Sequence, residues 1–259
     1  MALLEVAGLK KSFGGLHAVQ GFEFSMKEGE IVSLIGPNGS GKTTIFNLVT
    51  GMYGATAGRA TFLDRHRLLG LKPHAITALG IARTFQNQRL FNQMTVLENV
   101  LVGRNCRSRA GVAGIVLGLP SVRAEKAKVI DEAKELLALF GTRLLPRADR
   151  LAYSLSYANR RRLEIARALA TEPRLLLLDE PAAGMNPTES RELMADILRI
   201  RERGISILLI EHDMTIVRGI SDRVIALDHG VQIAEGDFAT VRNNPFVIEA
   251  YLGRRVAHA

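Results

Sequence analysis

Tryptophan is absent from this chain of 259 residues, and cysteine occurs once, at Cys106. A lone cysteine excludes an internal disulfide framework, and we expect no reactive-thiol chemistry at this position. The N-terminus also lacks the charged segment and following apolar segment of a secretory leader. Together these absences lead us to expect an intracellular protein.

Long hydrophobic runs are lacking as well. The most apolar stretch, Gly111 to Pro120, is rich in glycine and far shorter than the roughly 20 residues that a membrane-spanning helix needs. The net charge of +8 favours an anionic partner, which could be nucleic acid, anionic lipid or ATP. Nucleic acid ranks last, because only 5% of the residues are aromatic and the basic residues are scattered through amphipathic stretches.

The remaining composition, with 47% hydrophobic residues, is that of an ordinary globular protein, and 259 residues are enough for one sizeable core or for one core with an attached lobe. Short β-like runs at Leu3 to Ala7 and Phe22 to Met26 alternate with turns and predict an antiparallel layer. Two apolar runs, Leu175 to Leu178 and Ile205 to Ile210, flank an amphipathic helix from Thr188 to Arg201. This order predicts an α/β fold with a parallel sheet covered on both faces.

A helical lobe is predicted between about residues 87 and 169, where apolar residues recur every three or four positions, most clearly from Ala124 to Phe140. Further on, Val224 to Leu227 and Val231 to Glu235 flank Asp228-His229-Gly230, which is typical of a β-hairpin. The final segment, Gly253 to Ala259, is expected to fray.

A glycine-rich loop follows the apolar run Ile31 to Ile35 and precedes an amphipathic segment from Lys42 to Thr50. Its sequence, GPNGSGKT, fits the pattern G-x-x-x-x-G-K-[ST], in which backbone N–H groups and a helix N-terminus surround phosphate oxygens. Lys42 should reach the β- and γ-phosphates, and the Thr43 hydroxyl should bind Mg²⁺. The predicted nucleotide contacts from this loop are Gly36, Asn38, Gly39, Ser40, Gly41, Lys42, Thr43 and Thr44.

Two acids end the apolar run Leu175 to Leu178, and buried carboxylates are costly unless a cation or hydrogen bonds compensate them. Beside a phosphate-binding loop, Asp179 is placed to hold Mg²⁺ through water, opposite Thr43. Glu180 would then polarise the attacking water.

The segment LSYAN, Leu155 to Asn159, followed by RRRLEIARAL, resembles the signature motif of ABC ATPases. Gln86, in RTFQ, resembles their Q-loop, and His212, in IEHD, resembles their switch histidine. The resemblance implies a P-loop NTPase (RecA-like) core with an N-terminal antiparallel β subdomain and an inserted α-helical subdomain. The implied division is 1–86 with 171–253 for the core and β layer, 87–170 for the helical subdomain with the signature, and 254–259 for a tail.

The resemblance also implies roles for these residues. Ser156 can cap the helix that follows it, and in this family that helix end faces the γ-phosphate held by the other subunit. Gln86 would touch Mg²⁺ or the attacking water, and His212 would contact the γ-phosphate and orient Glu180. Phe13 lies where the family stacks an aromatic ring on adenine, with Val19 packed on the same ring, although a core role for Phe13 is the alternative. The implied catalytic residues are Glu180, His212, Gln86 and Lys42. The implied metal ligands are Thr43, Gln86 and Asp179, and Ser156 and Ala158 are implied to contact nucleotide. The other histidines, His17, His66, His74, His229 and His258, are interpreted as surface residues.

Several positions depart from the family pattern. Where the signature usually reads LSGGQ, this chain has Tyr157, Ala158 and Asn159, of which Tyr157 is common in one branch of the family. Ala158 replaces a glycine that approaches phosphate closely, so its methyl group could crowd the γ-phosphate or demand a backbone conformation that alanine resists. Our hypothesis is that Ala158 slows hydrolysis or weakens closure of the dimer. Asn186 stands where many members have aspartate.

Within the family the chain resembles the LivG-type ATPases of branched-chain amino acid importers, through GGLHAV at Gly14 to Val19, RTFQ, and the ending VIEAYLG. The resemblance implies ABC permease subunits, a LivF-like ATPase or a second copy as dimer partner, an extracytoplasmic binding protein, and a cytoplasmic position on the inner face of the membrane. Alternatives are transporters of urea, amides or lipopolysaccharide, or a hydrolysis-impaired regulatory subunit. Soluble ABC ATPases of DNA repair or translation are disfavoured, because neither a coiled-coil insertion nor a second cassette is present.

Overall fold

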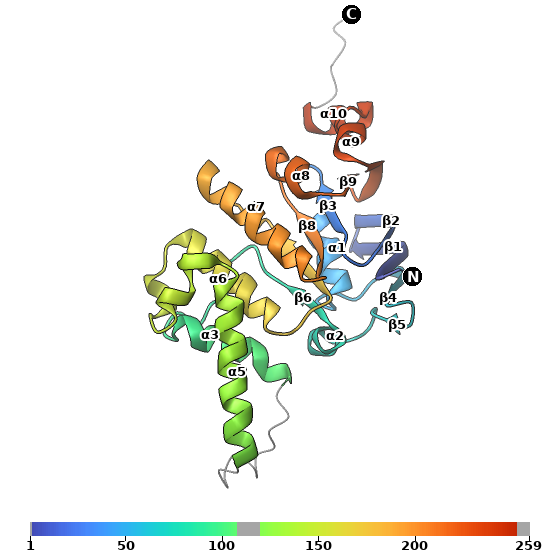
Figure 1. Cartoon of the computed structure of the whole chain (residues 1–259). Helices are drawn as coiled ribbons and strands as arrows, with labels where there is room; N and C mark the ends of the chain where they lie inside the picture. Colours follow the sequence, from blue (N-terminus) through green and yellow to red (C-terminus); the bar gives the residue numbers. More distant parts are fainter. Residues whose placement is uncertain (1, 108–119, 253–259) are drawn as a thin grey trace, which may run out of the picture.

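The computed structural model describes residues 2–107 and 120–252 of the chain (Figure 1). The apolar stretch at 111–119 and the C-terminal residues 253–259, for which fraying was predicted, lie outside the described residues. In the described part the strands form two sheets, and helices lie between and around them.

The smaller sheet is antiparallel and has four strands in the order β2-β1-β4-β5. They are β1 (Leu4–Phe13), β2 (Leu16–Met26), β4 (Ala57–Phe62) and β5 (His66–Arg67). The predicted antiparallel layer is therefore present, but β1 continues well past Ala7. Gly8 adopts a φ of 59°, and the pairing of β1 with both neighbours shifts register there, so the strand bends instead of ending.

The larger sheet has six strands in the order β10-β9-β3-β8-β7-β6. They are β3 (Ile31–Ile35), β6 (Ile81–Arg83), β7 (Leu175–Asp179), β8 (Ser206–Ile210), β9 (Arg223–Asp228) and β10 (Val231–Gly236). All neighbours are parallel except β9 and β10, which form the predicted hairpin.

The helices follow the predicted order along the chain. They are α1 (Lys42–Val49), α2 (Pro73–Leu79), α3 (Val96–Arg104), α5 (Pro120–Ala138), α6 (Tyr157–Leu169), α7 (Pro187–Glu202), α8 (Met214–Ile220), α9 (Phe238–Arg242) and α10 (Pro245–Leu252). Figure 1 shows α3, α5 and α6 gathered at one end of the molecule and α9 and α10 at the other.

The apolar strands are buried on both faces because their side chains alternate between two cores. In β7, Leu175 and Leu177 pack with α1 and the antiparallel sheet, whereas Leu176 and Leu178 pack with the helices on the opposite face. The α1 helix therefore lies between the two sheets, where Phe46 is fully buried. This arrangement confirms the predicted parallel sheet covered on both faces.

The parallel pairing brings several strand ends to one edge of the larger sheet. Arg83 pairs with Leu177, and Asp179 and Leu34 both pair with Ile210. Consequently the segments that follow β3, β6, β7 and β8 leave the sheet side by side. Such carboxyl edges are where α/β proteins bind ligands.

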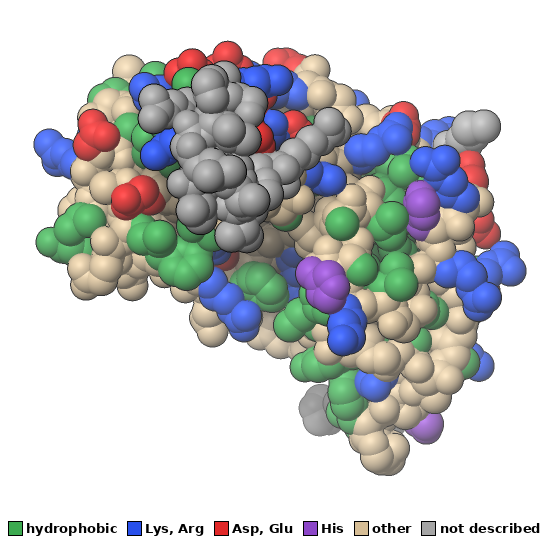
Figure 2. All heavy atoms as spheres, turned by 90° about the horizontal axis from the view of Figure 1, so that it is seen from below, with side chains coloured by type: hydrophobic (Ala, Val, Ile, Leu, Met, Phe, Trp, Pro, Cys, Tyr) green, Lys and Arg blue, Asp and Glu red, His purple; other side chains and the backbone are tan. Residues whose placement is uncertain are grey.

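The face of the molecule seen in Figure 2 carries Lys and Arg side chains spread among acidic and apolar ones, without one continuous basic patch in its coloured part. None of the helices within 2–107 and 120–252 has the length and apolar character needed to cross a bilayer.

Candidate active site

The loop between β3 and α1 can be built only with glycine at key positions. Gly36 has a φ of 143°, and a Cβ atom there would lie 2.1 Å from the Leu227 carbonyl oxygen. Gly41, with a φ of 104°, would place a Cβ 2.6 Å from the Ala18 carbonyl oxygen. The glycines therefore serve both the turn and the close packing of the loop against its neighbours.

Lys42 stands at the first position of α1, behind the loop. Its Nζ donates hydrogen bonds to the Gly36 carbonyl at 2.7 Å and to the Pro37 carbonyl at 2.8 Å. Burial lowers the pKa of the ammonium, and the nearby Glu180 and Asp179 carboxylates oppose that shift. The positive charge of Lys42 thus lies at the N-terminus of a helix, where the backbone N–H groups also favour a bound anion.

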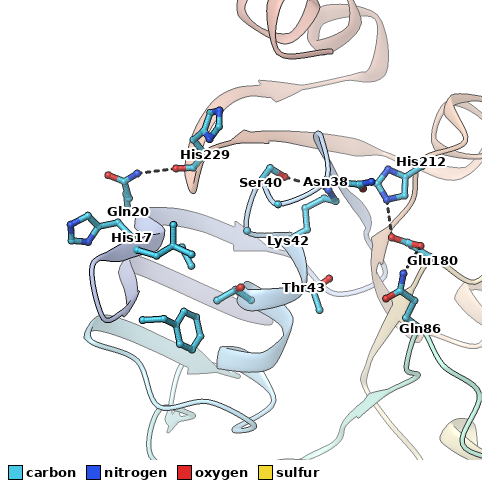
Figure 3. Close-up of a pocket in the computed structure, with 16 residues that line it drawn as sticks. His17, Gln20, Asn38, Ser40, Lys42, Thr43, Gln86, Glu180, His212 and His229 are labelled. Carbon is cyan, nitrogen blue, oxygen red and sulfur yellow. Dashed lines mark hydrogen bonds and ion pairs between the residues drawn. The ribbon is translucent and has the colours of Figure 1, made fainter. Parts of the chain in front are cut away.

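A cavity of about 650 Å³ opens above this loop (Figure 3). Such a volume is typical of a small-molecule site. Its lining joins the loop to five other segments of the chain. The lining residues are Phe13, Leu16, His17, Ala18, Gln20, Asn38, Gly39, Ser40, Gly41, Lys42, Thr43, Thr44, Gln86, Glu180, His212 and His229.

Glu180 is held at the cavity by two side chains from neighbouring strand ends. His212 Nε2 lies 2.7 Å from Glu180 Oε1, and Gln86 Nε2 donates to Oε2 at 3.1 Å (Figure 3). Glu180 itself has a φ of 48°, a left-handed conformation that is unfavourable for a residue other than glycine. The surrounding hydrogen bonds must hold Glu180 in this conformation, and they also fix the direction of its carboxylate.

Glu211 fixes the backbone on either side of this site. Its buried carboxylate accepts hydrogen bonds from the Ala182 N–H at 2.9 Å and the His212 N–H at 3.1 Å. Burial raises the pKa of the Glu211 carboxyl, and these backbone donors oppose the rise. The acid thus ties the turn after β7 to the end of β8, which fixes the separation of Glu180 and His212.

Asp179 lies under the cavity and is 1% exposed. Arg83 Nη2 donates to its Oδ2 at 2.8 Å, while Oδ1 is buried with no hydrogen-bond partner. Burial raises the pKa of the Asp179 carboxyl, against the opposing effect of Arg83. Arg83 was not among the predicted site residues, although it ends the short apolar run Ile81–Arg83 just before Gln86, which is a usable signal.

The predicted Mg²⁺ ligands fit such an ion by their chemistry. The orphaned Oδ1 of Asp179, the Thr43 hydroxyl and the Gln86 amide oxygen are all hard oxygen donors, which Mg²⁺ prefers. Within the part of the chain that the structure describes, no cluster of three His, Cys, Asp or Glu side chains could hold a metal by itself. That donor set suits an ion that takes most of its ligands from water and substrate phosphates.

Phe13 lies at the rim of the cavity rather than in the core, because its side chain is 42% exposed. Its ring meets Tyr53 edge to face, with centroids 5.4 Å apart, and Lys11 Nζ lies 4.8 Å from the ring centroid. Val19, in contrast, is buried in the core beneath Gly41 and does not line the cavity. The alternative core role for Phe13 is therefore wrong.

Two histidines interpreted as surface residues also line the cavity. His17 Nδ1 lies 2.9 Å from the Ser12 hydroxyl, and the His229 carbonyl accepts a hydrogen bond from Gln20 at 2.8 Å. Both side chains face solvent at the rim. The tip of the β9-β10 hairpin therefore closes one side of the cavity, which sequence patterns alone did not indicate.

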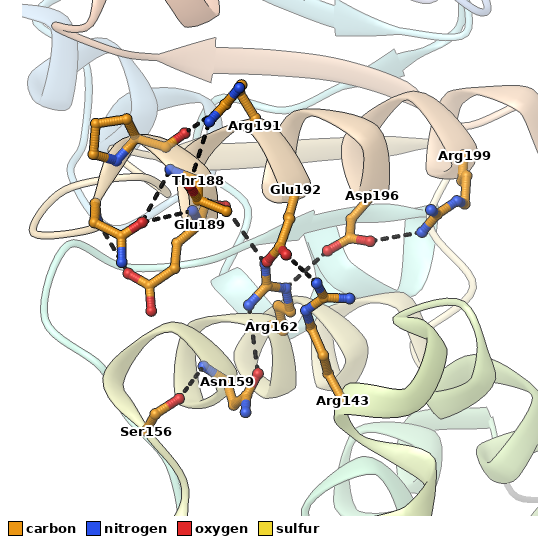
Figure 4. Close-up of polar contacts among 12 residues, drawn as sticks. Arg143, Ser156, Asn159, Arg162, Thr188, Glu189, Arg191, Glu192, Asp196 and Arg199 are labelled. Carbon is orange, nitrogen blue, oxygen red and sulfur yellow. Dashed lines mark hydrogen bonds and ion pairs between the residues drawn. The ribbon is translucent and has the colours of Figure 1, made fainter.

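Ser156 and Ala158 lie outside this cavity, at the N-terminus of α6. Ser156 is the N-cap, and its hydroxyl accepts from the Asn159 N–H at 3.4 Å (Figure 4). Ala158 lies in the first helical turn, a conformation that alanine adopts readily, so the strained backbone considered for it is wrong. Asn186 caps α7 through Thr188 and Glu189, a role that asparagine and aspartate fill equally well.

Tyr251, on α10, is a further residue that the sequence analysis did not assign to the site. Its hydroxyl accepts a hydrogen bond of 2.8 Å from the Gly36 N–H, the first amide of the loop. Burial raises the pKa of the phenol, so the hydroxyl stays neutral. The C-terminal helix is thereby attached to the phosphate-binding loop, a contact between distant segments that no local pattern announces.

We predict that Tyr251→Phe weakens nucleotide binding about three- to tenfold, because the loop loses a hydrogen bond, worth about 1 kcal/mol, that holds Gly36 in the conformation to which phosphate binds. The measurement is the dissociation constant of a fluorescent ATP analogue. Tyr153→Phe changes an exposed tyrosine outside the cavity and should bind as the unaltered chain does. Equal affinities for all three proteins would remove Tyr251 from the site.

Comparisons with known proteins show the family to which the chain belongs. The family model described as ABC transporter matches residues 19–183. A second model, described as branched-chain amino acid ATP-binding cassette transporter, matches residues 231–257, which include α10. Among curated proteins, the high-affinity branched-chain amino acid transport ATP-binding protein LivG of Salmonella typhimurium is 48% identical over 252 residues, which is 97% of this chain and 98% of that protein.

Solved structures give the same result. An ATP-binding cassette of an ABC transporter in its ADP conformation superposes with a TM-score of 0.84 at 32% identity, covering 98% of this chain and 100% of the other. A dimeric cassette in a post-hydrolysis state, bound to ADP and Pi, gives 0.73 at 25% identity, covering 91% and 98%. The predicted P-loop NTPase fold with an antiparallel β layer is thus confirmed, and this chain belongs to the ABC transporter ATP-binding proteins, in the LivG group of branched-chain amino acid transport ATPases.

Proposed function

We propose that this ABC ATPase hydrolyses ATP in the cavity above the glycine-rich loop, with Glu180 as the base that activates water. The observation that carries the proposal is the carboxylate of Glu180, held by Gln86 and His212 at the mouth of a phosphate-binding loop. A glutamate without a specific role would not be expected to adopt an unfavourable left-handed backbone conformation and to bond with two other side chains.

ATP would bind with its phosphates against the backbone N–H groups of the loop and the N-terminus of α1. Lys42 would turn from the loop carbonyls to the β- and γ-phosphates, which offer stronger charge-assisted hydrogen bonds. The exposed ring of Phe13 would stack on the adenine at the far rim.

During hydrolysis, Glu180 would accept a proton from the attacking water while Gln86 and His212 fix the direction of its carboxylate. The required Mg²⁺ would be held by Thr43, by Asp179 through water and by Gln86, and it would neutralise charge on the phosphates. Arg83 keeps the Asp179 carboxylate in place beneath the site by its hydrogen bond.

Ser156 and Ala158 would complete the site of a neighbouring subunit, because they lie outside the cavity of their own chain. The N-terminus of α6 is a capped helix end with a positive dipole, suited to a γ-phosphate held by another subunit. The similar dimeric cassette with ADP and Pi supports such a pairing. The partner would be a LivF-like ATPase or a second copy.

We further propose that the assembly lies on the cytoplasmic face of the membrane, bound to permease subunits that import branched-chain amino acids supplied by an extracytoplasmic binding protein. In this division, residues 87–170 form the helical subdomain that transmits closure to the permease, and 1–86 with 171–253 form the core. The 48% identity with LivG and the match of the C-terminal segment support this cargo over urea, amides or lipopolysaccharide.

The shared site can be tested with a photoreactive benzophenone side chain at Tyr157, which is 42% exposed beside Ser156. In the chain purified with its transporter partners, ATP without free Mg²⁺ should give a crosslink to the glycine-rich loop of another polypeptide. Mass spectrometry of the crosslinked peptide identifies that loop and shows whether the partner is a second copy.

The same probe at Tyr153, which is also exposed, is the control and should give no crosslink to a glycine-rich loop. With ADP in place of ATP the Tyr157 crosslink should be lost. A Tyr157 crosslink that stays within its own chain, or that forms equally with ADP, would contradict the proposed dimer.

Ala158 is only 3% exposed in the single chain, so its methyl group would crowd a neighbour's γ-phosphate only if closure of the dimer uncovers it, and this gives a separate prediction. Ala158→Gly should raise ATP turnover in the assembled transporter about fivefold, the effect of roughly 1 kcal/mol of relieved contact in the transition state. Ala168→Gly makes the same change later in α6 and should lower stability without raising turnover. If Ala158→Gly left turnover unchanged or reduced it, the crowding hypothesis would be discarded.

A further inference from the structure

Two consecutive arginines of α6, Arg161 and Arg162, are among the most deeply buried side chains, with exposed fractions of 0% and 1%. Burying a guanidinium is costly unless charges and hydrogen bonds compensate it. Neighbouring side chains on a helix point about 100° apart, so these two arginines reach different parts of the molecule.

Arg162 faces α7. Its Nε donates to Asp196 Oδ2 at 2.8 Å, and its Nη2 donates to Glu192 Oε2 at 3.2 Å (Figure 4). Arg199 and Arg143 extend this network along the surface of the same helix pair. Arg162 Nη1 also donates to Asn159 Oδ1 within α6 at 3.4 Å. None of these contacts reaches Gln86 or Glu180.

Arg161 faces the segment that follows β6. Its Nη1 donates to the Phe85 carbonyl at 2.7 Å, and its Nη2 donates to the Gln86 carbonyl at 3.0 Å. Nη2 also lies 3.4 Å from the backbone carbonyl of Glu180. One side chain thus contacts the backbone of both residues whose side chains meet at the cavity, Gln86 and Glu180.

Glu164 completes this arrangement. It is 2% exposed, and its Oε2 accepts from Arg161 Nη1 at 3.1 Å. Its Oε1 accepts from the Phe85 N–H at 3.3 Å. The Phe85 residue is therefore bound at its N–H by Glu164 and at its carbonyl by Arg161, so the position of Gln86 follows that of α6.

We propose that Arg161 and Glu164 form a positioning pair, which sets the Gln86 and Glu180 side chains at the separation needed for hydrolysis. This proposal rests on the proposed role of Glu180. It adds two named residues of α6 that connect the helix to the Glu180 carboxylate. Because Ser156 caps the same helix, a nucleotide bound at the N-terminus of α6 acts through this pair on the chain's own site. Misplacement by about 1 Å can cost about a hundredfold in rate, so a small shift of α6 is sufficient.

The test must separate positioning from mere stability. Removing one partner of a buried pair leaves an unpaired charge, whereas replacing both by apolar residues of similar size is often neutral for stability. The variant is therefore Arg161→Met combined with Glu164→Leu, in the full chain purified with its transporter partners. The matched control is Arg162→Met with Asp196→Leu, which removes the equivalent pair toward α7.

Three quantities are measured for both variants: kcat and KM for ATP with Mg²⁺, the thermal unfolding midpoint, and amide hydrogen exchange across 84–88 without nucleotide. For the Arg161/Glu164 variant we expect kcat to fall at least about tenfold with KM within about twofold, since the phosphate loop is not altered. Exchange at the Phe85 amide should accelerate, because its bond to Glu164 is lost. The control should keep kcat and the exchange pattern whatever its unfolding midpoint.

Arg161→Lys adds a graded case, because one ammonium can pair with Glu164 but cannot span two carbonyls as a guanidinium does. Its kcat should lie between those of the unaltered chain and the double variant. The proposal is overturned if the Arg161/Glu164 variant matches the unaltered chain in kcat, or loses no more than the control. Because exchange is read without ATP, it tests the pair even if the unaltered chain proved unable to hydrolyse ATP.

Discussion

The pair of hydrogen bonds that hold the Glu180 carboxylate between His212 and Gln86 is the contact on which the rest of the site depends. It exists because β6, β7 and β8 are parallel neighbours whose carboxyl ends meet at one edge of the sheet. Each strand contributes one of the three side chains in the segment that follows it. A loss of register between these strands would separate the three groups, since each residue step along a strand is about 3.3 Å.

Four buried charged side chains beneath the site each form hydrogen bonds with a segment that carries an active-site residue. Arg83 holds Asp179, Glu211 joins the ends of β7 and β8, and Arg161 with Glu164 holds the backbone before Gln86. Ion pairs of this kind contribute little net stability, because desolvation offsets their attraction. Their value here lies in geometry, which apolar packing cannot specify so narrowly.

The sequence predicted those features that depend on neighbours along the chain. The glycine loop, the acids that end β7 and the hairpin around His229 follow from short patterns with a direct physical reason. The attachment of Tyr251 to Gly36 and of Arg161 to Phe85 joins residues far apart in sequence, so periodicity and spacing carry no sign of it. The bend at Gly8 was not predicted, because a glycine that follows a short apolar run indicates the end of a strand as often as a bend within it.

ATP turnover of Glu180→Gln tests the central claim most directly, because the amide keeps the size of the side chain and cannot accept the proton of water. The account predicts that kcat falls by at least about a hundredfold, as expected for loss of a general base, while the dissociation constant for ATP stays unchanged. Turnover by Glu180→Gln at the rate of the unaltered chain would contradict the account.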